Sequence, residues 1–412
     1  MDAERTAERG RFEPRPSRSW HGRLLNRVLS RIEHGELEVC MSDGSRYLHQ
    51  GTESGPQARI TIHRPGRLVW RLATSGGLGL DDAFLAGDWE TDQLSDFLTL
   101  MAANEHTFGR IGEPRLLTRI VTGLSHRRRR NTKRGSRRNI AAHYDIGNDF
   151  YREWLDPGMT YSAALFDRHD EDLERAQQRK YDAILDRLDL QPGQHILEIG
   201  CGWGGLAEAA ARRGARVTGI TLSREQLEFA RHRIDDAGLS DLVELRLQDY
   251  RDVDGLFDHV VSIEMFEAVG QDYWQTFFEC VRNRLKPGGR AALQIITMDA
   301  EFFQRYRLNP DFIQRYIFPG GMLPTVTELR TIVQRLGLDL AETQFHGEHY
   351  AATLHRWHER FNTAWHQIQH LGFDERFRRM WRYYLAYCEA GFRTGRIDLM
   401  QTALISAPGR EA

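Results

Sequence analysis

Cysteine is scarce in this chain of 412 residues, and long apolar runs are missing. The four cysteines lie far apart in the sequence, and no two have the spacing of a metal-ligand pair. No apolar stretch approaches the roughly 18 residues of a membrane span. Residues 1–19 are polar and charged and lack the apolar segment of a signal peptide. These absences predict a reduced, cytoplasmic protein without a bound metal, and a disordered tail over 1–19.

Charge is informative only locally, because the net charge is −2. Between residues 125 and 139 the chain has eight basic residues and no acid, namely Arg127, Arg128, Arg129, Arg130, Lys133, Arg134, Arg137 and Arg138. We interpret this segment as a linker between two domains. It either binds the anionic surface of a membrane, serves as an arm for nucleic acid, or is merely solvated. No nucleic-acid motif accompanies it, so we expect a membrane and no nucleic acid as partner.

Residues 20–124 have the patterns of a small α+β domain. Apolar residues alternate over 37–41, and Asp43-Gly44 is a hairpin turn signal. Residues 60–62 and 68–70 are further β-like runs, whereas apolar residues at 94, 97, 98 and 101 predict one buried helix face. No catalytic motif occurs here. The domain therefore either docks or dimerises the protein, or binds lipid.

A glycine-rich stretch over 196–205 organises the second half of the chain. An apolar run ends in Glu198, and glycines follow at positions 200, 202, 204 and 205. Glycines at a strand–helix turn let the backbone approach a ligand closely. The spacing also fits a dinucleotide loop, but the next strand, over 216–220, ends in Thr221-Leu222-Ser223 without the required acid. The pattern instead resembles the S-adenosylmethionine (SAM) loop of Rossmann-like methyltransferases.

Strands and helices alternate around this loop. A helix is predicted over 174–188, and further strands over 243–247, 257–263 and 291–297. Such alternation gives a parallel, doubly wound sheet with ligands at the carboxyl ends of its strands. We therefore expect a Rossmann-like α/β catalytic domain over 140–412. Gln226 fits both a capping box with Ser223 and a ribose contact, whereas Asp249 and Tyr250 suit the adenine amino group and ring.

Aromatic residues are dense beyond Met298. They recur at helical spacing, which is typical of a core, but their number also fits a tunnel for an acyl chain. The residues concerned are Phe302, Phe303, Tyr306, Phe312, Tyr316, Phe318, Trp357, Phe361, Trp365, Trp381, Tyr383 and Tyr384. We expect them to form a helical, lipid-binding lobe of the catalytic domain.

Several motifs together resemble the cyclopropane fatty acid synthase family, which includes the mycolic acid cyclopropane synthases. The resemblance covers residues 139–406, and it is weaker in the N-terminal domain. The matching motifs are Ala142–Asp145, Met159–Ser162, Leu197–Gly204, Gly219–Ser223, Met265–Gly270, Tyr316–Gly321 and His349–Leu354. Enzymes of this family take a methylene from SAM and add it across a cis double bond of an acyl chain in a membrane phospholipid.

The resemblance implies SAM as cofactor. The residues expected to hold it are Tyr161, Ser162, Glu198, Gly200, Gly202, Gly204, Thr221, Leu222, Gln226, Asp249, Tyr250 and Ile263.

The resemblance also implies a bound bicarbonate as the base that removes a proton from the added methyl group. Glu267, Tyr350 and Ile296 match the residues that would hold it, although Glu267 also suits a helix start. Two positions depart, because Ala163 replaces a cysteine and Gln294 replaces a histidine. Ala163 preserves a contact made through the backbone N–H, whereas Gln294 can donate one hydrogen bond but carries no charge.

The chemistry accounts for the residue types. An alkene that attacks a sulfonium methyl becomes a carbocation-like centre, which aromatic faces in an apolar pocket hold by cation–π attraction. We therefore expect an enzyme at the inner face of the membrane that makes cyclopropane fatty acyl chains in unsaturated phospholipids, either alone or as a homodimer. The alternatives are a methyl- or methylene-branched product, a soluble methyltransferase for small molecules, and a lipid-binding protein without activity.

Overall fold

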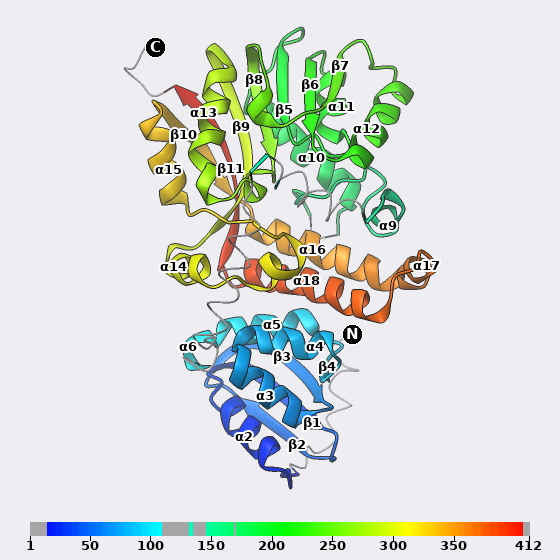
Figure 1. Ribbon diagram of the computed structural model, residues 1–412, viewed down its shortest axis with the longest axis vertical. Coiled ribbons are helices and arrows are strands. Elements are labelled where there is room, and N and C mark those ends of the chain that lie inside the picture. Colours follow the sequence, from blue (N-terminus) through cyan, green and yellow to red (C-terminus); the bar gives the residue numbers. More distant parts are fainter. Residues whose placement is uncertain (1–14, 109–131, 134, 136–145, 169, 407–412) are drawn as a thin grey trace. The chain divides into compact units, whose positions relative to one another are not determined.

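The computed structural model describes residues 15–108, 132–133, 135, 146–168 and 170–406, which form two compact units (Figure 1). The first unit contains the described residues up to 108 together with Asp374–Thr394, and the second contains the rest. The expected catalytic domain over 140–412 thus includes a segment that packs with the first unit. The 142–145 motif, most of the basic segment and most of the tail lie outside the described residues.

The first unit is built on a four-stranded sheet with the order β2-β1-β3-β4. β1 pairs antiparallel with β2 and parallel with β3, and β3 pairs antiparallel with β4. The strands are β1 (His34–Met41), β2 (Arg46–Gln50), β3 (Glu53–Ile62) and β4 (Trp89–Glu90). The predicted hairpin is confirmed, since β1 and β2 flank the turn at Asp43-Gly44, where Gly44 has a φ of 82°.

Helices complete this unit, so the expected α+β class is confirmed for its described residues. They are α2 (Trp20–Leu29), α3 (Pro65–Ser75), α4 (Gly77–Leu85), α5 (Leu94–Ala103), α6 (Glu105–Phe108) and α18 (Glu375–Arg393). The helix predicted over 94–101 is α5. The strand predicted over 68–70 is wrong, because these residues lie in α3: Pro65 occupies the first turn, where its missing N–H costs nothing, and Leu68 is buried while Trp70 is exposed.

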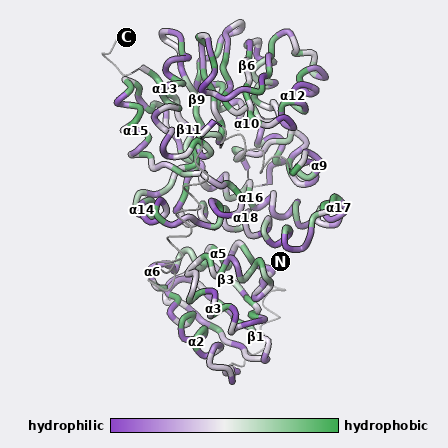
Figure 2. The backbone as a smooth tube through the Cα atoms, in the orientation of Figure 1, coloured by the Kyte–Doolittle hydropathy of each residue, from purple (hydrophilic) through white to green (hydrophobic). Residues whose placement is uncertain are grey.

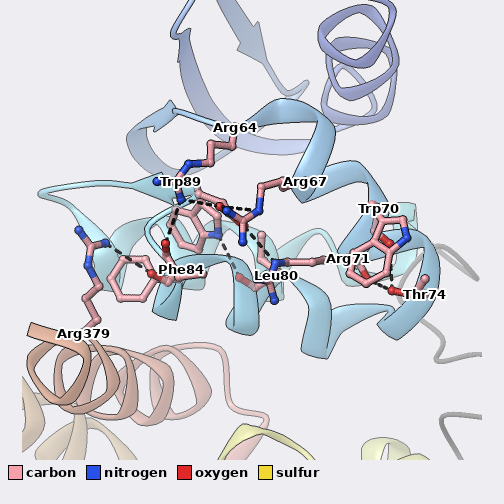
Figure 3. Close-up of polar contacts among 11 residues, drawn as sticks. Arg64, Arg67, Trp70, Arg71, Thr74, Leu80, Phe84, Trp89 and Arg379 are labelled. Carbon is pink, nitrogen blue, oxygen red and sulfur yellow. Dashed lines mark hydrogen bonds and ion pairs between the residues drawn. The ribbon is translucent and has the colours of Figure 1, made fainter.

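Asp88 is a buried acid that ties α3 to the loop before β4. Its side chain is fully buried and accepts from Arg64 at 2.9 Å and from Arg71 at 3.0 Å, with Arg67 at 3.5 Å. Figure 3 shows these three arginine side chains converging from α3 and the residue before it. Charge-assisted hydrogen bonds of this kind compensate the cost of burying a carboxylate.

The second unit is an α/β unit with a seven-stranded sheet of order β10-β11-β9-β8-β5-β6-β7. The five strands from β9 to β7 are parallel, and β11 and β10 add antiparallel pairs at one edge. The strands are β5 (His195–Ile199), β6 (Arg216–Thr221), β7 (Val243–Leu247), β8 (Phe257–Ile263), β9 (Leu285–Met298), β10 (Leu338–Phe345) and β11 (Ile397–Ser406). The Rossmann-like class and the predicted strands are confirmed.

The second unit also contains helices, some of which cover the two faces of the sheet (Figure 1). They are α9 (Asn148–Arg152), α10 (Leu173–Asp186), α11 (Gly205–Arg212), α12 (Arg224–Asp236), α13 (Trp274–Arg284), α14 (Ala300–Leu308), α15 (Val326–Arg335), α16 (Gly347–Thr363) and α17 (Trp365–His370), with short 3₁₀ turns at Tyr250–Asp252, Phe266–Ala268 and Gln271–Tyr273 and a π turn at Ile313–Ile317. No helix among the described residues is long and apolar enough to cross a membrane.

Side-chain alternation along β5 explains the two layers of core. Leu197 and Ile199 belong to a cluster with α13 residues such as Phe277, whereas Ile196 belongs to a cluster with α11 residues such as Ala210. Successive side chains of a strand point to opposite faces, so an apolar run is buried on both sides. The loops at the carboxyl ends of the strands are thereby held on a rigid base.

We expect Asp88→Ala to destabilise the first unit by about 1–3 kcal/mol, because it leaves three arginines without their acceptor. Hydrogen exchange of peptides from α4 and α5, measured on the full chain, reports this loss. Asp96→Ala is the control, since the half-exposed pair of Asp96 with Arg393 contributes less than ~1 kcal/mol. Equal protection in both variants would contradict a structural role for the buried acid.

Candidate active site

The turn between β5 and α11 leaves room for a ligand against its backbone. Gly202 has a φ of 51°, and a Cβ built on it meets no heavy atom within 4 Å. Gly200 has a φ of 90°, and its Cβ would lie 2.8 Å from the Cγ of Met265. Only glycine adopts these conformations freely and keeps the space beside Gly202 open. Gly204 caps α11 with a φ of 83°.

Glu198 is an acceptor at the tip of β5. It is 4% exposed, and its Oε2 atom has no hydrogen-bond partner. Burial raises the pKa of Glu198 to about 8, and the charges of Lys180 and Arg233 oppose that shift. A ligand that brings hydroxyl donors, such as the ribose of SAM, would satisfy the free oxygen. The open glycine turn and this acceptor together fit SAM.

The tip of β6 is fixed by its own hydrogen bonds. Ser223 caps α12 by accepting from the N–H of Gln226 at 3.2 Å, so the helix-capping interpretation has a structural basis. The side-chain Oε1 of Gln226 accepts from the Thr221 hydroxyl at 2.9 Å. Both residues are buried, whereas Leu222 is partly exposed beside them.

At the tip of β7, Asp249 is not a free acid of the kind expected to bind the adenine amino group. Both oxygens of Asp249 accept from the Arg251 guanidinium, at 2.8 and 2.7 Å. The ring of Tyr250 packs against Phe277 with centroids 5.6 Å apart, and its hydroxyl has no partner. Ile263 ends β8 and is partly buried.

Helix α10 holds the segment that carries Tyr161 and Ser162. The Gln177 amide donates to the carbonyl of Ser162 at 2.8 Å, and Lys180 donates to the Ser162 hydroxyl at 2.7 Å. These two side chains are one helical turn apart, so they share a face of the helix. Lys180 is fully buried, and burial lowers its pKa to about 8, while the nearby carboxylates oppose the shift.

An aromatic cluster surrounds Tyr161. The ring centroid of Tyr161 lies 5.4 Å from Tyr151, 5.6 Å from Trp154 and 5.4 Å from Trp357. Tyr350 lies 6.3 Å from Trp357 at an edge-on angle of 86°. Aromatic rings of this kind attract a cation through their π faces. Trp381, Tyr383 and Tyr384, in contrast, lie on α18 and pack within the first unit.

Three of the groups expected to hold bicarbonate instead converge on a carboxylate of the chain, Glu264. Glu264 Oε1 accepts from the Ala163 N–H at 2.8 Å and from the Gln294 amide at 2.7 Å, and Oε2 accepts from the Tyr350 hydroxyl. Burial raises the pKa of Glu264, and these three hydrogen bonds lower it. All three partners donate, so they stabilise the ionised form. Bicarbonate does not fit, because its expected donors are taken.

Glu267, the acid expected to orient the base, lies one turn further along the chain. Its Oε1 accepts from the backbone N–H of Ile296 at 2.6 Å, and its buried Oε2 has no partner. Burial raises the pKa of Glu267 to about 8, and the charge of Glu264 raises it further. Burial thus raises the pKa of both acids, and the three donors favour the ionised form of Glu264 more than the single donor favours that of Glu267.

Gln401 fixes the orientation of the Gln294 amide. The two residues face each other in the β9–β11 pair, and both are fully buried. Gln401 donates to the Gln294 carbonyl oxygen at 2.8 Å, which leaves the Gln294 NH₂ to donate to Glu264.

Sequence reasoning missed Glu264, Lys180 and Gln401. For Glu264 a signal existed, because it is an acid directly after a strand that ends at the ligand edge of the sheet. Its φ of 48° is also unusual for a residue other than glycine and is typical of functional sites. Lys180 and Gln401 carry no local signal, since their partners are distant in the sequence.

The parallel sheet, the glycine turn and the free acceptor of Glu198 define a class I SAM-dependent methyltransferase. A family model described as mycolic acid cyclopropane synthetase matches residues 131–402. The chain therefore belongs to the mycolic acid cyclopropane synthetase family, and it is a SAM-dependent enzyme.

Individual relatives differ in the product that their names give. Tuberculostearic acid methyltransferase UfaA1 of Mycobacterium tuberculosis is 41% identical over 396 residues, which are 93% of this chain and 91% of the relative. Cyclopropane-fatty-acyl-phospholipid synthase of Escherichia coli K12 is 39% identical over 80% of this chain and 84% of its own. The crystal structure of mycolic acid cyclopropane synthase CmaA1 with S-adenosylhomocysteine has a TM-score of 0.61 and 32% identity, covering 65% of this chain and 97% of that one.

We expect Gly202→Val to abolish SAM binding in isothermal titration calorimetry, because the branched side chain would fill the open space beside the turn. Gly238→Val is the matched control: Gly238 also has a positive φ, 67°, and open space around its Cβ. It lies in the loop after α12. Unchanged SAM affinity in Gly202→Val would disprove the assignment of the turn.

The pKa of Glu267 near 8 predicts a pH-dependent stability. An unfolded glutamate titrates near ~4.3, so above that pH the unfolded chain loses the proton first. The contribution of the neutral side chain to stability is full below ~4.3 and is lost as pH rises toward about 8. Glu267→Gln should therefore raise the melting temperature relative to wild type more at pH 8 than at pH 5. The exposed Glu228→Gln should show no such difference.

Proposed function

We propose that the protein transfers a methyl group from SAM to the cis double bond of an unsaturated acyl chain in a phospholipid, and that Glu264 is the base. One observation carries this proposal: a side-chain carboxylate with three donors lies beside a cluster of aromatic rings. SAM, when bound, supplies an electrophilic methyl group, whose transfer to an alkene leaves positive charge on the acyl chain.

The aromatic cluster is suited to hold this charge. Tyr161, Trp154 and Trp357 present π faces in a site where Trp154 and Trp357 are fully buried. Each such contact with a desolvated cation is worth about 2 kcal/mol. Tyr350 connects this cluster to the base, since its ring borders Trp357 and its hydroxyl donates to Glu264.

Glu264 then removes the proton. Its carboxylate takes one hydrogen from the cationic chain as H⁺, and the electron pair of that C–H bond becomes a new carbon–carbon bond. The product is one CH₂ unit heavier than the substrate. If the pair forms a double bond, the product is a branched chain that keeps one unsaturation; if it closes a three-membered ring, the product is a cyclopropane.

We favour the branched product. The base here is tethered to the backbone, and the groups implied to hold a mobile base are used to hold Glu264 instead. The relative named for tuberculostearic acid supports the same choice. The cyclopropane is the second candidate, since Glu267 and Tyr350 are both present and the resemblance implies these residues for ring formation.

Mass spectrometry of a dioleoyl phospholipid treated with enzyme and SAM distinguishes the two products. We expect each modified acyl chain to be one CH₂ unit heavier and to take up one equivalent of hydrogen itself, under catalytic conditions that leave a cyclopropane intact. Glu264→Gln should keep SAM affinity and lose roughly 10²–10⁴-fold in turnover, because the amide accepts no proton. Glu342→Gln is the matched control, since Glu342 is exposed and also has a positive φ, 50°.

The triple variant Glu264→Gly, Ala163→Cys, Gln294→His tests the assignment of Glu264 as the base by restoring the residues implied to hold bicarbonate. Glycine tolerates the positive φ at position 264 and removes the carboxylate from its three donors, and the other two changes restore the residues that the resemblance implies at 163 and 294. With added bicarbonate we expect part of the product to become cyclopropane. A wild-type enzyme that makes only cyclopropane, and whose rate survives Glu264→Gln, would refute Glu264 as the base.

A further inference from the structure

Helices α2 and α3 of the first unit expose large apolar side chains. Eight such residues are exposed among the described part of the chain, and three of them lie on these two short helices. Trp20 is 58% exposed, Leu24 40% and Trp70 65%. The other five are spread over the second unit, on separate elements. Both exposed tryptophans thus belong to one pair of helices.

Helices α2 and α3 contact each other beside Trp20 and one turn before Trp70. A Cβ on Gly66 of α3 would lie 3.4 Å from the His21 ring of α2, and the Trp20 ring stacks on His21 with centroids 3.8 Å apart. Trp70 follows Gly66 by one helical turn, and Leu24 follows Trp20 by one turn. We call this surface, formed by Trp20, Leu24 and Trp70, the α2–α3 face.

Positive charge borders the α2–α3 face. Neither helix contains an aspartate or a glutamate, and Arg23 and Arg27 are exposed on α2. Arg64 before α3 and Arg67 and Arg71 on α3 bring three positive charges to the single negative charge of Asp88, and the side chains of Arg64 and Arg67 are 49% and 56% exposed. Figure 3 shows Trp70 on the same helix as Arg67 and Arg71, and Figure 2 shows hydrophilic and hydrophobic residues alternating along α2 and α3.

We propose that the α2–α3 face binds the surface of an anionic phospholipid bilayer. Tryptophan rings are amphipathic and prefer the interface between head groups and acyl chains, where exposed leucine also gains from burial. Arginines without neighbouring acids complement anionic head groups. The proposal goes beyond the catalytic function, because every residue of this face lies in the first unit and none belongs to the candidate active site.

Sedimentation of the full chain with vesicles tests this surface. Wild type should bind vesicles that contain phosphatidylglycerol more tightly than pure phosphatidylcholine, and less tightly at high salt. The double variant Trp20→Ser, Trp70→Ser should weaken the binding by at least about tenfold. Arg23→Gln with Arg27→Gln should weaken it about thirtyfold on anionic vesicles, and hardly on neutral ones. Leu256→Ser, which changes a 55% exposed leucine of the second unit, is the matched control.

Two further measurements separate this surface from the active site and from an alternative occupant. The tryptophan variant should keep SAM affinity and turnover on detergent-dispersed lipid, and lose turnover on vesicles. Vesicle binding equal to that of Leu256→Ser would overturn the proposal. It would also be overturned if the variant changed a dimer into a monomer without affecting vesicle binding, because the face would then contact a second copy of the chain.

Discussion

A carboxylate can be withdrawn from water only where donors meet its oxygens, and Glu264 depends on three of them. The donors come from separate parts of the second unit: Ala163 precedes α10, Gln294 lies on β9, and Tyr350 lies on α16. Two of them are held in turn. Lys180 and Gln177 hold the segment before Ala163, and Gln401 orients Gln294. The packing of the helices on the sheet thus serves to keep one negative charge in place.

Glu264 and Glu267 lie three residues apart in the sequence, but their carboxyl groups have different environments. Glu264 receives three hydrogen bonds, whereas Glu267 receives one and keeps an unpartnered oxygen. Hydrogen bonds to a carboxylate lower its pKa, and burial without them raises it. The more strongly hydrogen-bonded Glu264 is therefore the better placed of the two to carry a negative charge. The fully buried ammonium of Lys180 also lowers the pKa of Glu264, because its positive charge favours the ionised carboxylate.

The sequence was a good guide where the signal is local. The apolar run before Glu198, the glycine turn and the alternation of strands and helices predicted the sheet and its ligand edge, and the structure has them. It was a poor guide at residues 68–70, where β-branched and aromatic residues suggested a strand but Pro65 begins a helix. It also failed at Glu264, because only the fold brings Ala163, Gln294 and Tyr350 to one carboxylate. Ala163 and Gln294 could be read as departures from the family, but not as the partners of a new acid.

A base that is part of the chain, as we propose for Glu264, changes what the site can select. A mobile anion must be captured from solution and can adjust to the cation, whereas Glu264 is fixed by its backbone and three hydrogen bonds. Fixed geometry favours the C–H bond that lies nearest to the base, and so it favours one product. The departures at Ala163 and Gln294 then have a common cause. Once Glu264 supplies the negative charge, a neutral amide at position 294 and a bare backbone N–H at 163 are sufficient donors, and a charged histidine is not needed to retain an ion.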